Sequence, residues 1–265
     1  MTVLVAGGSG RLGRLVVRSL IADGMHVRVL TRYKERAIDV QALGAEPVVG
    51  DLSDSAAVDR AVEGCSTVIA AASGFGPMGS ASPRSVDRDG TATLISRSEQ
   101  AGVARFVLVS MQGAAPRATL EILRMKNAAE QVLRSSGMTW TIIRPAPFLE
   151  TYLEVVGQPM RRRNATLVFG KGNVAAEFVP VADVAALVCT AVRHPERGGG
   201  IVEGRGEERT LNELSETVHR AAGRPGRTIH VPVWFMRVVS VAARPVSPFA
   251  SRAAAGAVWI TSRRR

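Results

Sequence analysis

Short apolar runs alternate with longer amphipathic segments through the first half of the chain. The runs TVLVA and FVLVS are almost entirely apolar, which is typical of strands buried on both faces of a parallel sheet. Between the first two runs, Arg11–Asp23 places apolar residues on one helical face and ends at Gly24. Further helices are expected up to Val62, capped by Asp54, and over Ala118–Arg134. The predicted strands are Thr2–Ala6, His26–Thr31, Pro47–Val49, Thr67–Ala72, Arg105–Ser110 and Thr139–Arg144.

Strands that alternate with helices of this length predict a parallel sheet with right-handed crossovers. The expected fold class is therefore α/β, a Rossmann-type doubly wound parallel sheet. Two long loops, Ser73–Arg84 and Met111–Arg117, follow the fourth and fifth strands, at the edge where open α/β sheets bind ligands. The second half is less regular, with helices expected over Val179–Arg193 and Thr210–Ala222 and short helices in the apolar tail from Val231 to Ile260.

A glycine-rich turn joins the first strand to the first helix. It reads GGSGRLG, from Gly7 to Gly13. Gly7 allows a tight turn, Gly10 lets the backbone approach a pyrophosphate, and Gly13 lets the helix pack closely on the sheet. The helix then offers free N–H groups and the positive end of its dipole to the phosphates. Because a strand, a helix and a second strand surround the turn, the spacing predicts a dinucleotide site rather than a glycine turn without a ligand.

Further segments extend this motif over nearly the whole chain. Together they read GGSGRLG, VLTR, VVGDLSD, VDRDGTATLISRSEQAGVARFVLVS, KNAAEQVLRSSGMTWTIIRP and FVPVADVA. With this set the sequence resembles the short-chain dehydrogenase/reductase superfamily, and more narrowly its atypical, NmrA-like branch. The resemblance implies one NAD(P)-binding domain over residues 1–265. Its nucleotide-binding core is expected at 1–150 and its small, mostly helical substrate-binding or lid part at 151–178 and 204–265, with 179–203 returning to the core.

The end of the second predicted strand bears on the choice of nucleotide. An acid there would bind both ribose hydroxyls of NAD, but this chain has Thr31 and Arg32, followed by Lys34 and Arg36. A guanidinium matches a 2′-phosphate in charge and geometry, so we expect NADP(H) in preference to NAD(H). The alternative is an Arg32 that stacks on adenine or faces solvent. With the resemblance added, the expected cofactor site comprises Gly7, Ser9, Gly10, Arg11, Leu12, Gly13, Thr31, Arg32, Asp51, Leu52, Ala71, Ala72, Ser73, Lys126, Pro145 and Phe148.

The usual proton donor of the superfamily is missing from this sequence. That chemistry uses a Ser together with a Tyr four residues before a Lys, and the Tyr protonates the carbonyl oxygen as hydride arrives. Ser110 and Lys126 match the Ser and the Lys, but Ile122 stands where the Tyr would be. Tyr152, after the sixth strand, is a candidate substitute donor. The structural alternatives are a strand-end hydroxyl for Ser110, a solvated helix lysine for Lys126 and a half-buried helix aromatic for Tyr152.

Two functions fit this pattern. In the first, the protein is an NADP(H)-dependent oxidoreductase that reduces a ketone, quinone or enone, chiefly by placing hydride donor and acceptor together. In the second, it is a non-catalytic, NADP(H)-binding, redox-sensing regulator of the NmrA-like type. We favour the enzyme, because the loop after the fourth strand and the apolar tail are typical of walls around a small organic substrate.

Composition narrows the choice of partners. The 265 residues carry 34 Lys and Arg against 23 Asp and Glu, a net charge of +11, but the arginines are spread along the chain and aromatic residues make up 5%. We therefore expect a solvated surface that favours anionic ligands, and no nucleic-acid site. Cys65 and Cys189 lie in apolar segments and the four histidines are scattered. No disulfide or metal site is predicted, and a cytoplasmic location is expected.

The tail is the most apolar part of the second half. Trp234 and Phe235 lie near Arg237 and Arg244, and an interfacial membrane helix has such a composition. A substrate lid or a homodimer surface has the same composition and fits the family resemblance better. No run of about 18 uncharged apolar residues occurs, so no membrane-spanning helix is expected.

Overall fold

The computed structural model describes residues 1–75, 81–194 and 199–262. It divides into two compact units. The first comprises Met1–Pro145 with Val181–Gly204, and the second Ala146–Pro180 with Arg205–Arg265. The predicted loop after the fourth strand lies partly outside the described residues, as does the arginine cluster at the end of the sequence.

The first unit is built on a seven-stranded sheet in which all neighbouring strands run parallel. Their order is β3-β2-β1-β4-β5-β6-β9, which confirms the predicted Rossmann-type α/β fold. Because the order reverses between β1 and β4, the connections that follow these two strands diverge and open a crevice where such sheets bind ligands. The strands are β1 Thr2–Ala6, β2 His26–Thr31, β3 Glu46–Val49, β4 Thr67–Ala70, β5 Arg105–Val109, β6 Thr139–Pro145 and β9 Gly200–Gly204.

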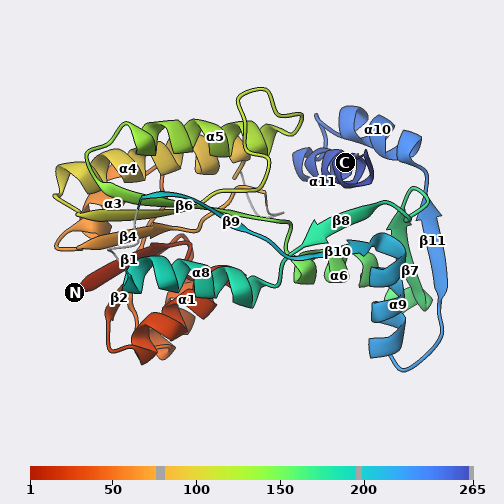
Figure 1. Ribbon diagram of the computed structural model, residues 1–265, viewed down its shortest axis with the longest axis horizontal. Coiled ribbons are helices and arrows are strands. Elements are labelled where there is room, and N and C mark those ends of the chain that lie inside the picture. The colour runs from red at the N-terminus through yellow and green to blue at the C-terminus, as the bar shows by residue number, and fades with distance from the viewer. Residues whose placement is uncertain (76–80, 195–198, 263–265) are drawn as a thin grey trace. The chain divides into compact units, whose positions relative to one another are not determined.

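Helices cover both faces of this sheet (Figure 1). On one face α1 packs against α8, and on the other α4 packs against both α3 and α5. Fully buried Leu4 and Phe106 from the strands meet Leu94 and Leu133 from α4 and α5 in one apolar core, and burial of each such side chain contributes roughly 1.5–3 kcal/mol. The helices are α1 Arg11–Ala22, α2 Lys34–Ala42, α3 Ser55–Val62, the π-helix η1 Pro83–Gly90, α4 Thr91–Gln100, α5 Glu121–Arg134 and α8 Val181–Arg193.

Two segments of the first unit differ from the sequence prediction. Gly200–Gly204 adds the edge strand β9, paired in parallel with β6, although its glycines and its single short apolar pair give little strand signal. Pro83 and Arg84, expected in a loop, begin the π-helix η1 instead. Ser82 caps this helix through a reciprocal pair of hydrogen bonds with Ser85, which satisfies backbone donors at its start.

The second unit combines helices with two small sheets, where mostly helical structure was expected. β8 pairs antiparallel with β10, and β7 pairs in parallel with β11. Each pair joins segments far apart in sequence, so local patterns do not reveal it. A separate core includes Val156, Phe178, Leu214 and Ile260. The elements are α6 Leu149–Gly157, α7 Met160–Arg163, β7 Ala165–Phe169, β8 Ala175–Phe178, β10 Glu207–Thr210, α9 Leu211–Ala221, β11 Arg227–Val231, α10 Val233–Ala242 and α11 Pro248–Ser262.

Within the described ranges, no helix combines the length and the apolar character needed to cross a bilayer.

Candidate functional site

The glycine turn between β1 and α1 is shaped by close backbone contacts. Gly7 has a φ of +89°, and a Cβ there would lie 2.7 Å from the backbone nitrogen of Ala72, in the connection that follows β4. A Cβ on Gly13 would lie 2.2 Å from the carbonyl oxygen of Gly7. Only glycine therefore fits at these two positions, because the left-handed φ and the close contact exclude a side chain at Gly7, and the close contact alone excludes one at Gly13.

The N-terminus of α1 is open to an anion. Gly10 stands at its cap without a side-chain hydrogen bond, and no acid occupies the first turn. The first N–H groups of an α-helix have no partner within the helix, so a capping side chain, water or a ligand accepts their hydrogen bonds. This glycine cradle, which a Cβ would fill, and the uncapped helix together fit the pyrophosphate of a dinucleotide.

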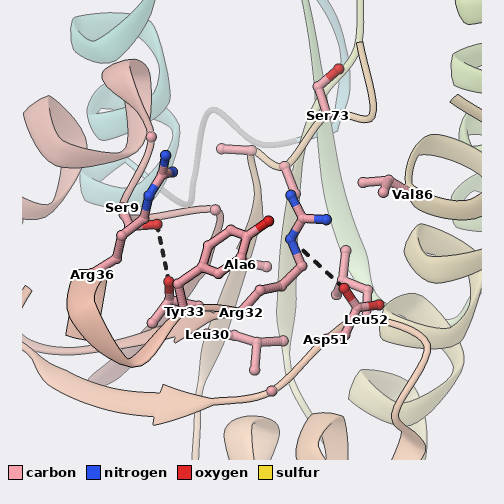
Figure 2. A pocket seen from close by; sticks show the side chains of 16 residues that line it. Ala6, Ser9, Leu30, Arg32, Tyr33, Arg36, Asp51, Leu52, Ser73 and Val86 are labelled. Atoms are coloured by element: carbon pink, nitrogen blue, oxygen red, sulfur yellow. Dashed lines mark hydrogen bonds and ion pairs between the residues drawn. The ribbon is translucent and has the colours of Figure 1, made fainter. Parts of the chain in front are cut away.

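A pocket lies directly beside this turn, at the carboxyl ends of the first four strands of the chain (Figure 2). The connections after β1, β2, β3 and β4 all contribute to it, as does η1 through one residue. This is the reversal point of the strand order, and ligand crevices of doubly wound sheets lie at that point. The lining residues are Ala6, Gly7, Ser9, Gly10, Leu30, Thr31, Arg32, Tyr33, Arg36, Gly50, Asp51, Leu52, Ala71, Ala72, Ser73 and Val86.

Two arginines and a tyrosine gather at one end of the pocket. The guanidinium carbons of Arg32 and Arg36 lie 5.4 Å and 5.6 Å from the centre of the Tyr33 ring, within cation–π range. Figure 2 shows Arg32 also directed toward Asp51, with Nε 3.7 Å from the carboxylate Oδ2. Both members of this ion pair are partly exposed, so solvent weakens their attraction. This end of the pocket therefore carries cationic groups that an anionic ligand would meet.

Hydrogen bonds steady the polar floor of the pocket. The hydroxyls of Ser9 and Thr31 lie 3.1 Å apart and link the glycine turn to the end of β2. Asp51 accepts hydrogen bonds from the backbone N–H and the hydroxyl of Ser53 through Oδ1. The first contact thus links the connections after β1 and β2, and the second pair orders the connection after β3.

Several residues expected at the cofactor site do not line this pocket. Leu12 is buried in α1 against the sheet, and Gly13 packs under Gly7. Phe148 belongs to the second unit, where it bridges to Val179. The others outside the lining are Arg11, Lys126 and Pro145, and the expected residues that do line the pocket are Gly7, Ser9, Gly10, Thr31, Arg32, Asp51, Leu52, Ala71, Ala72 and Ser73.

Sequence reasoning missed some lining residues. Tyr33 was not among the expected cofactor ligands, yet its ring lies between the two arginines as part of the pocket wall. Arg36 was noted as a basic residue that follows Arg32, but it was not among the expected cofactor ligands. Val86 reaches the pocket from η1, and nothing local marks it. The remaining missed residues are Ala6, Leu30 and Gly50.

The Ser110 hydroxyl is held by a buried acid. It donates to Glu130 on α5 at 2.5 Å, and both side chains are buried. Arg144 on β6 donates to both oxygens of the same carboxylate, at 2.9 Å and 2.6 Å. These hydrogen bonds from Arg144 to Glu130 raise the pKa of the guanidinium above its usual value. The Ser110 hydroxyl is thus not bound to backbone, and in this structure its proton is donated to Glu130.

Lys126 is also committed within the fold. Its ammonium forms an ion pair with Asp87 of η1 at 3.0 Å, donates to the carbonyl of Val109 at 2.8 Å and reaches that of Ala72 at 3.4 Å. The second carboxylate oxygen of Asp87 accepts from the N–H of Gly74 at 2.8 Å. Three acceptors match the three ammonium hydrogens. Lys126 therefore ties the connection after β4 to η1 and α5 and is not a solvated helix lysine. Its expected role as a ribose ligand stays a prediction.

Tyr152 lies on α6 of the second unit. Its ring packs edge-on against Phe178 with centroids 4.9 Å apart, at the border of that unit's apolar core. Among the described residues, no cluster of His, Cys, Asp or Glu has the geometry to hold a metal ion.

Comparison with known proteins places these features in a family. The NAD(P)H-binding family model matches residues 7–195. A (4-alkanoyl-5-oxo-2,5-dihydrofuran-3-yl)methyl phosphate reductase of Streptomyces griseus is 31% identical over 92% of this chain and 82% of its own length. The photosystem II assembly factor Ycf39 of Trieres chinensis is 27% identical over 91% of this chain and 75% of its own.

Among solved structures, the Citrobacter triphenylmethane reductase complexed with NADP(H) aligns with this chain at a TM-score of 0.80 and 19% identity, over 100% of this chain and 93% of that one. At this identity the likeness concerns the fold. The family match, the glycine turn and the pocket at the strand reversal agree with one another. The chain belongs to the NAD(P)H-binding family, within the atypical, NmrA-like branch of the short-chain dehydrogenase/reductases.

Proposed function

We propose that this protein is an NADP(H)-dependent reductase that transfers hydride to a small ketone, quinone or conjugated enone. The observation that carries the proposal is the pocket beside the glycine turn, with Arg32 and Arg36 at one end. Family membership supports coenzyme binding, and a relative named as a reductase supports the reaction class.

The charges of the pocket support NADP(H) over NAD(H). Thr31 and Arg32 stand at the end of β2 in place of the acid that would bind the ribose hydroxyls of NAD. Arg32 is exposed enough to leave its partner Asp51, and a phosphate dianion is a stronger partner for a guanidinium than a partly exposed carboxylate. Arg36 lies on the other side of Tyr33 and adds a second positive charge.

Each part of the coenzyme can be assigned to residues of the pocket. The glycine turn and the N-terminus of α1 would hold the pyrophosphate, Arg32 and Arg36 the 2′-phosphate, and Ala71 to Ser73 the nicotinamide ribose. When bound, NADPH supplies the hydride.

The buried polar groups favour an acceptor that needs no strong acid from the protein. The Ser110 hydroxyl and the Lys126 ammonium are both committed to buried carboxylates, and Ile122 replaces the usual Tyr. Quinones and conjugated enones give anions that solvent protonates readily, so NADPH, one proton from water and the acceptor yield NADP⁺ and the reduced product. Holding the hydride donor and the acceptor together then lowers the activation barrier, by about 7–11 kcal/mol in favourable cases.

The test is a coenzyme titration followed by a turnover assay. Calorimetry with NADPH, NADP⁺ and NADH measures affinity, and loss of NADPH absorbance measures turnover with a panel of quinones, enones and aromatic ketones. The proposal expects tighter NADPH than NADH binding and steady oxidation with at least one acceptor. Absence of coenzyme binding would exclude the whole proposal.

A second candidate is a coenzyme-binding regulator without turnover. The observation in its favour is that neither Ser110 nor Lys126 offers a proton to a substrate, because each side chain is already bound to a buried acid. Tight NADP(H) binding without oxidation by any acceptor, together with a protein partner whose affinity depends on the redox state of the coenzyme, would favour this candidate over the reductase.

A further inference from the structure

The helix α10 in the second unit is apolar around almost its whole circumference, yet none of its residues is buried. It reads VWFMRVVSVA. A helix that is apolar on all sides is ordinarily buried on all sides. In this fold, α10 packs beside α11 (Figure 1) and leaves its remaining surface to solvent.

The inner face of α10 accounts for its packing. Met236 packs against the core of the second unit. Ser240 accepts a hydrogen bond from the hydroxyl of Ser251 on α11 at 2.6 Å, through its carbonyl oxygen. The side chain of Val233 lies against Gly170, which follows β7. Spacings of three and four residues place these three α10 residues on one face, and this face anchors the helix.

The outer face carries large apolar side chains that this packing does not use. Trp234, Val238 and Val241 are 66%, 54% and 62% exposed, and their spacing of four and three residues forms a continuous stripe. Phe235, which is 45% exposed, widens it, because its ring meets that of Trp234 edge-on with centroids 5.9 Å apart. Scattered apolar residues on a surface need no explanation, but a contiguous apolar patch of this kind marks an interaction site.

The charged side chains of α10 and of the sequence that follows it have a single sign. Arg237 and Arg244 are exposed beside the stripe, and the sequence contains no Asp or Glu beyond Glu216. A second copy docked on this stripe about a two-fold axis would bring the arginines of the two stripes together, which like charges oppose. An apolar surface that carries anionic groups at its edge complements the stripe instead.

We propose that the outer face of α10 binds the surface of an anionic lipid bilayer. The helix would lie in the plane of the interface, with Trp234, Val238 and Val241 at the boundary of the acyl chains and Arg237 and Arg244 level with the lipid phosphates. Indole rings favour this depth, and arginine side chains extend their charged heads to the phosphate level while their stems stay apolar. The proposal does not depend on which reaction the first unit performs.

Co-sedimentation of the full-length protein with vesicles tests the proposal. Vesicles of phosphatidylcholine alone are compared with vesicles that also contain phosphatidylglycerol, at low and at high salt. The proposal expects binding to the mixed vesicles, weakening with salt, and a blue shift of tryptophan emission. Replacing all three stripe residues, as W234Q/V238Q/V241Q, should abolish both signals, whereas Ile38→Gln, at an exposed isoleucine of the first unit, should change neither.

The arginines give a second, independent arm. Arg237→Gln and Arg244→Gln should each weaken vesicle binding about fivefold, since a basic residue near an anionic surface is worth about a fivefold factor. Replacement of the exposed Arg18 or Arg60 of the first unit is the matched control. Circular dichroism during thermal unfolding shows that each variant is folded.

Three results would overturn the proposal. These are failure to bind mixed vesicles, equal binding to neutral and mixed vesicles, and self-association in sedimentation analysis that the triple variant removes. The last would assign the stripe to a second copy of the chain.

Discussion

Lys126 has two possible roles, a structural one as the partner of Asp87 and a cofactor-binding one, and its replacement by Met tells them apart. Methionine keeps most of the length and apolar volume of the lysine side chain but removes its charge. Asp87, which is fully buried, would then keep its negative charge, and among the described residues the N–H of Gly74 would be its remaining partner, at 2.8 Å. The carbonyls of Val109 and Ala72 would lose a donor as well.

The expected loss is large because the pair is buried on both sides, with side-chain exposures of 6% and 0%. Removing one partner of a buried ion pair typically costs about 3–5 kcal/mol, since the remaining charge is left uncompensated. For a domain of this size, each kcal/mol lowers Tm by about 2–4 °C. We therefore expect Lys126→Met to lower the Tm of the first unit by roughly 6–20 °C.

Circular dichroism during thermal unfolding measures this shift, and hydrogen exchange of the β4 and β5 amides localises it to the first unit. Lys34→Met, at an exposed lysine, is the control and should change Tm little. The double variant Asp87→Asn/Lys126→Met should be more stable than the sum of the single losses predicts, because the two groups are in contact. If Lys126→Met keeps its stability within about 1 kcal/mol and instead weakens NADPH binding, Lys126 is a coenzyme ligand and the structural role is refuted.

Three further predictions concern the pocket and the buried thiols. Arg32→Glu should weaken NADP(H) binding about 10- to 100-fold, the value of hydrogen bonds to a charged group, and NAD(H) binding far less; equal changes in calorimetry would reject the phosphate role. Gly13→Ala should lower the free energy of unfolding by about 1–3 kcal/mol through overpacking, because its Cβ would lie 2.2 Å from the Gly7 carbonyl oxygen; an unchanged urea midpoint would contradict this. Burial raises the pKa of the thiols of Cys65 and Cys189. The free energy of unfolding should therefore be retained below the unfolded-state thiol pKa of about 8.5 and fall as the pH rises from there through the folded-state pKa values. The native protein should also resist a thiol reagent at neutral pH, and rapid labelling would show that burial does not protect the thiols.

The sequence alone predicts six of the seven strands in the sheet of the first unit and one end of its pocket. The runs TVLVA and FVLVS are β1 and β5, because continuous apolar strands and amphipathic helices need only the local periodicity of the chain to be recognised. Gly7 and Gly10, which line the pocket, could be predicted from the local sequence as well. Their role follows from a turn whose neighbours in sequence are also its neighbours in space.

The partners of the buried polar side chains depend on tertiary packing. Lys126 pairs with Asp87, and Glu130 binds both Ser110 and Arg144. The members of these pairs are far apart in sequence, so their contacts depend on how η1, α5, β5 and β6 pack together. A buried charge takes whichever partner the packing brings within reach, since leaving it unpaired costs several kcal/mol. Residue type and spacing therefore indicated groups for catalysis, whereas packing assigned the same groups to each other.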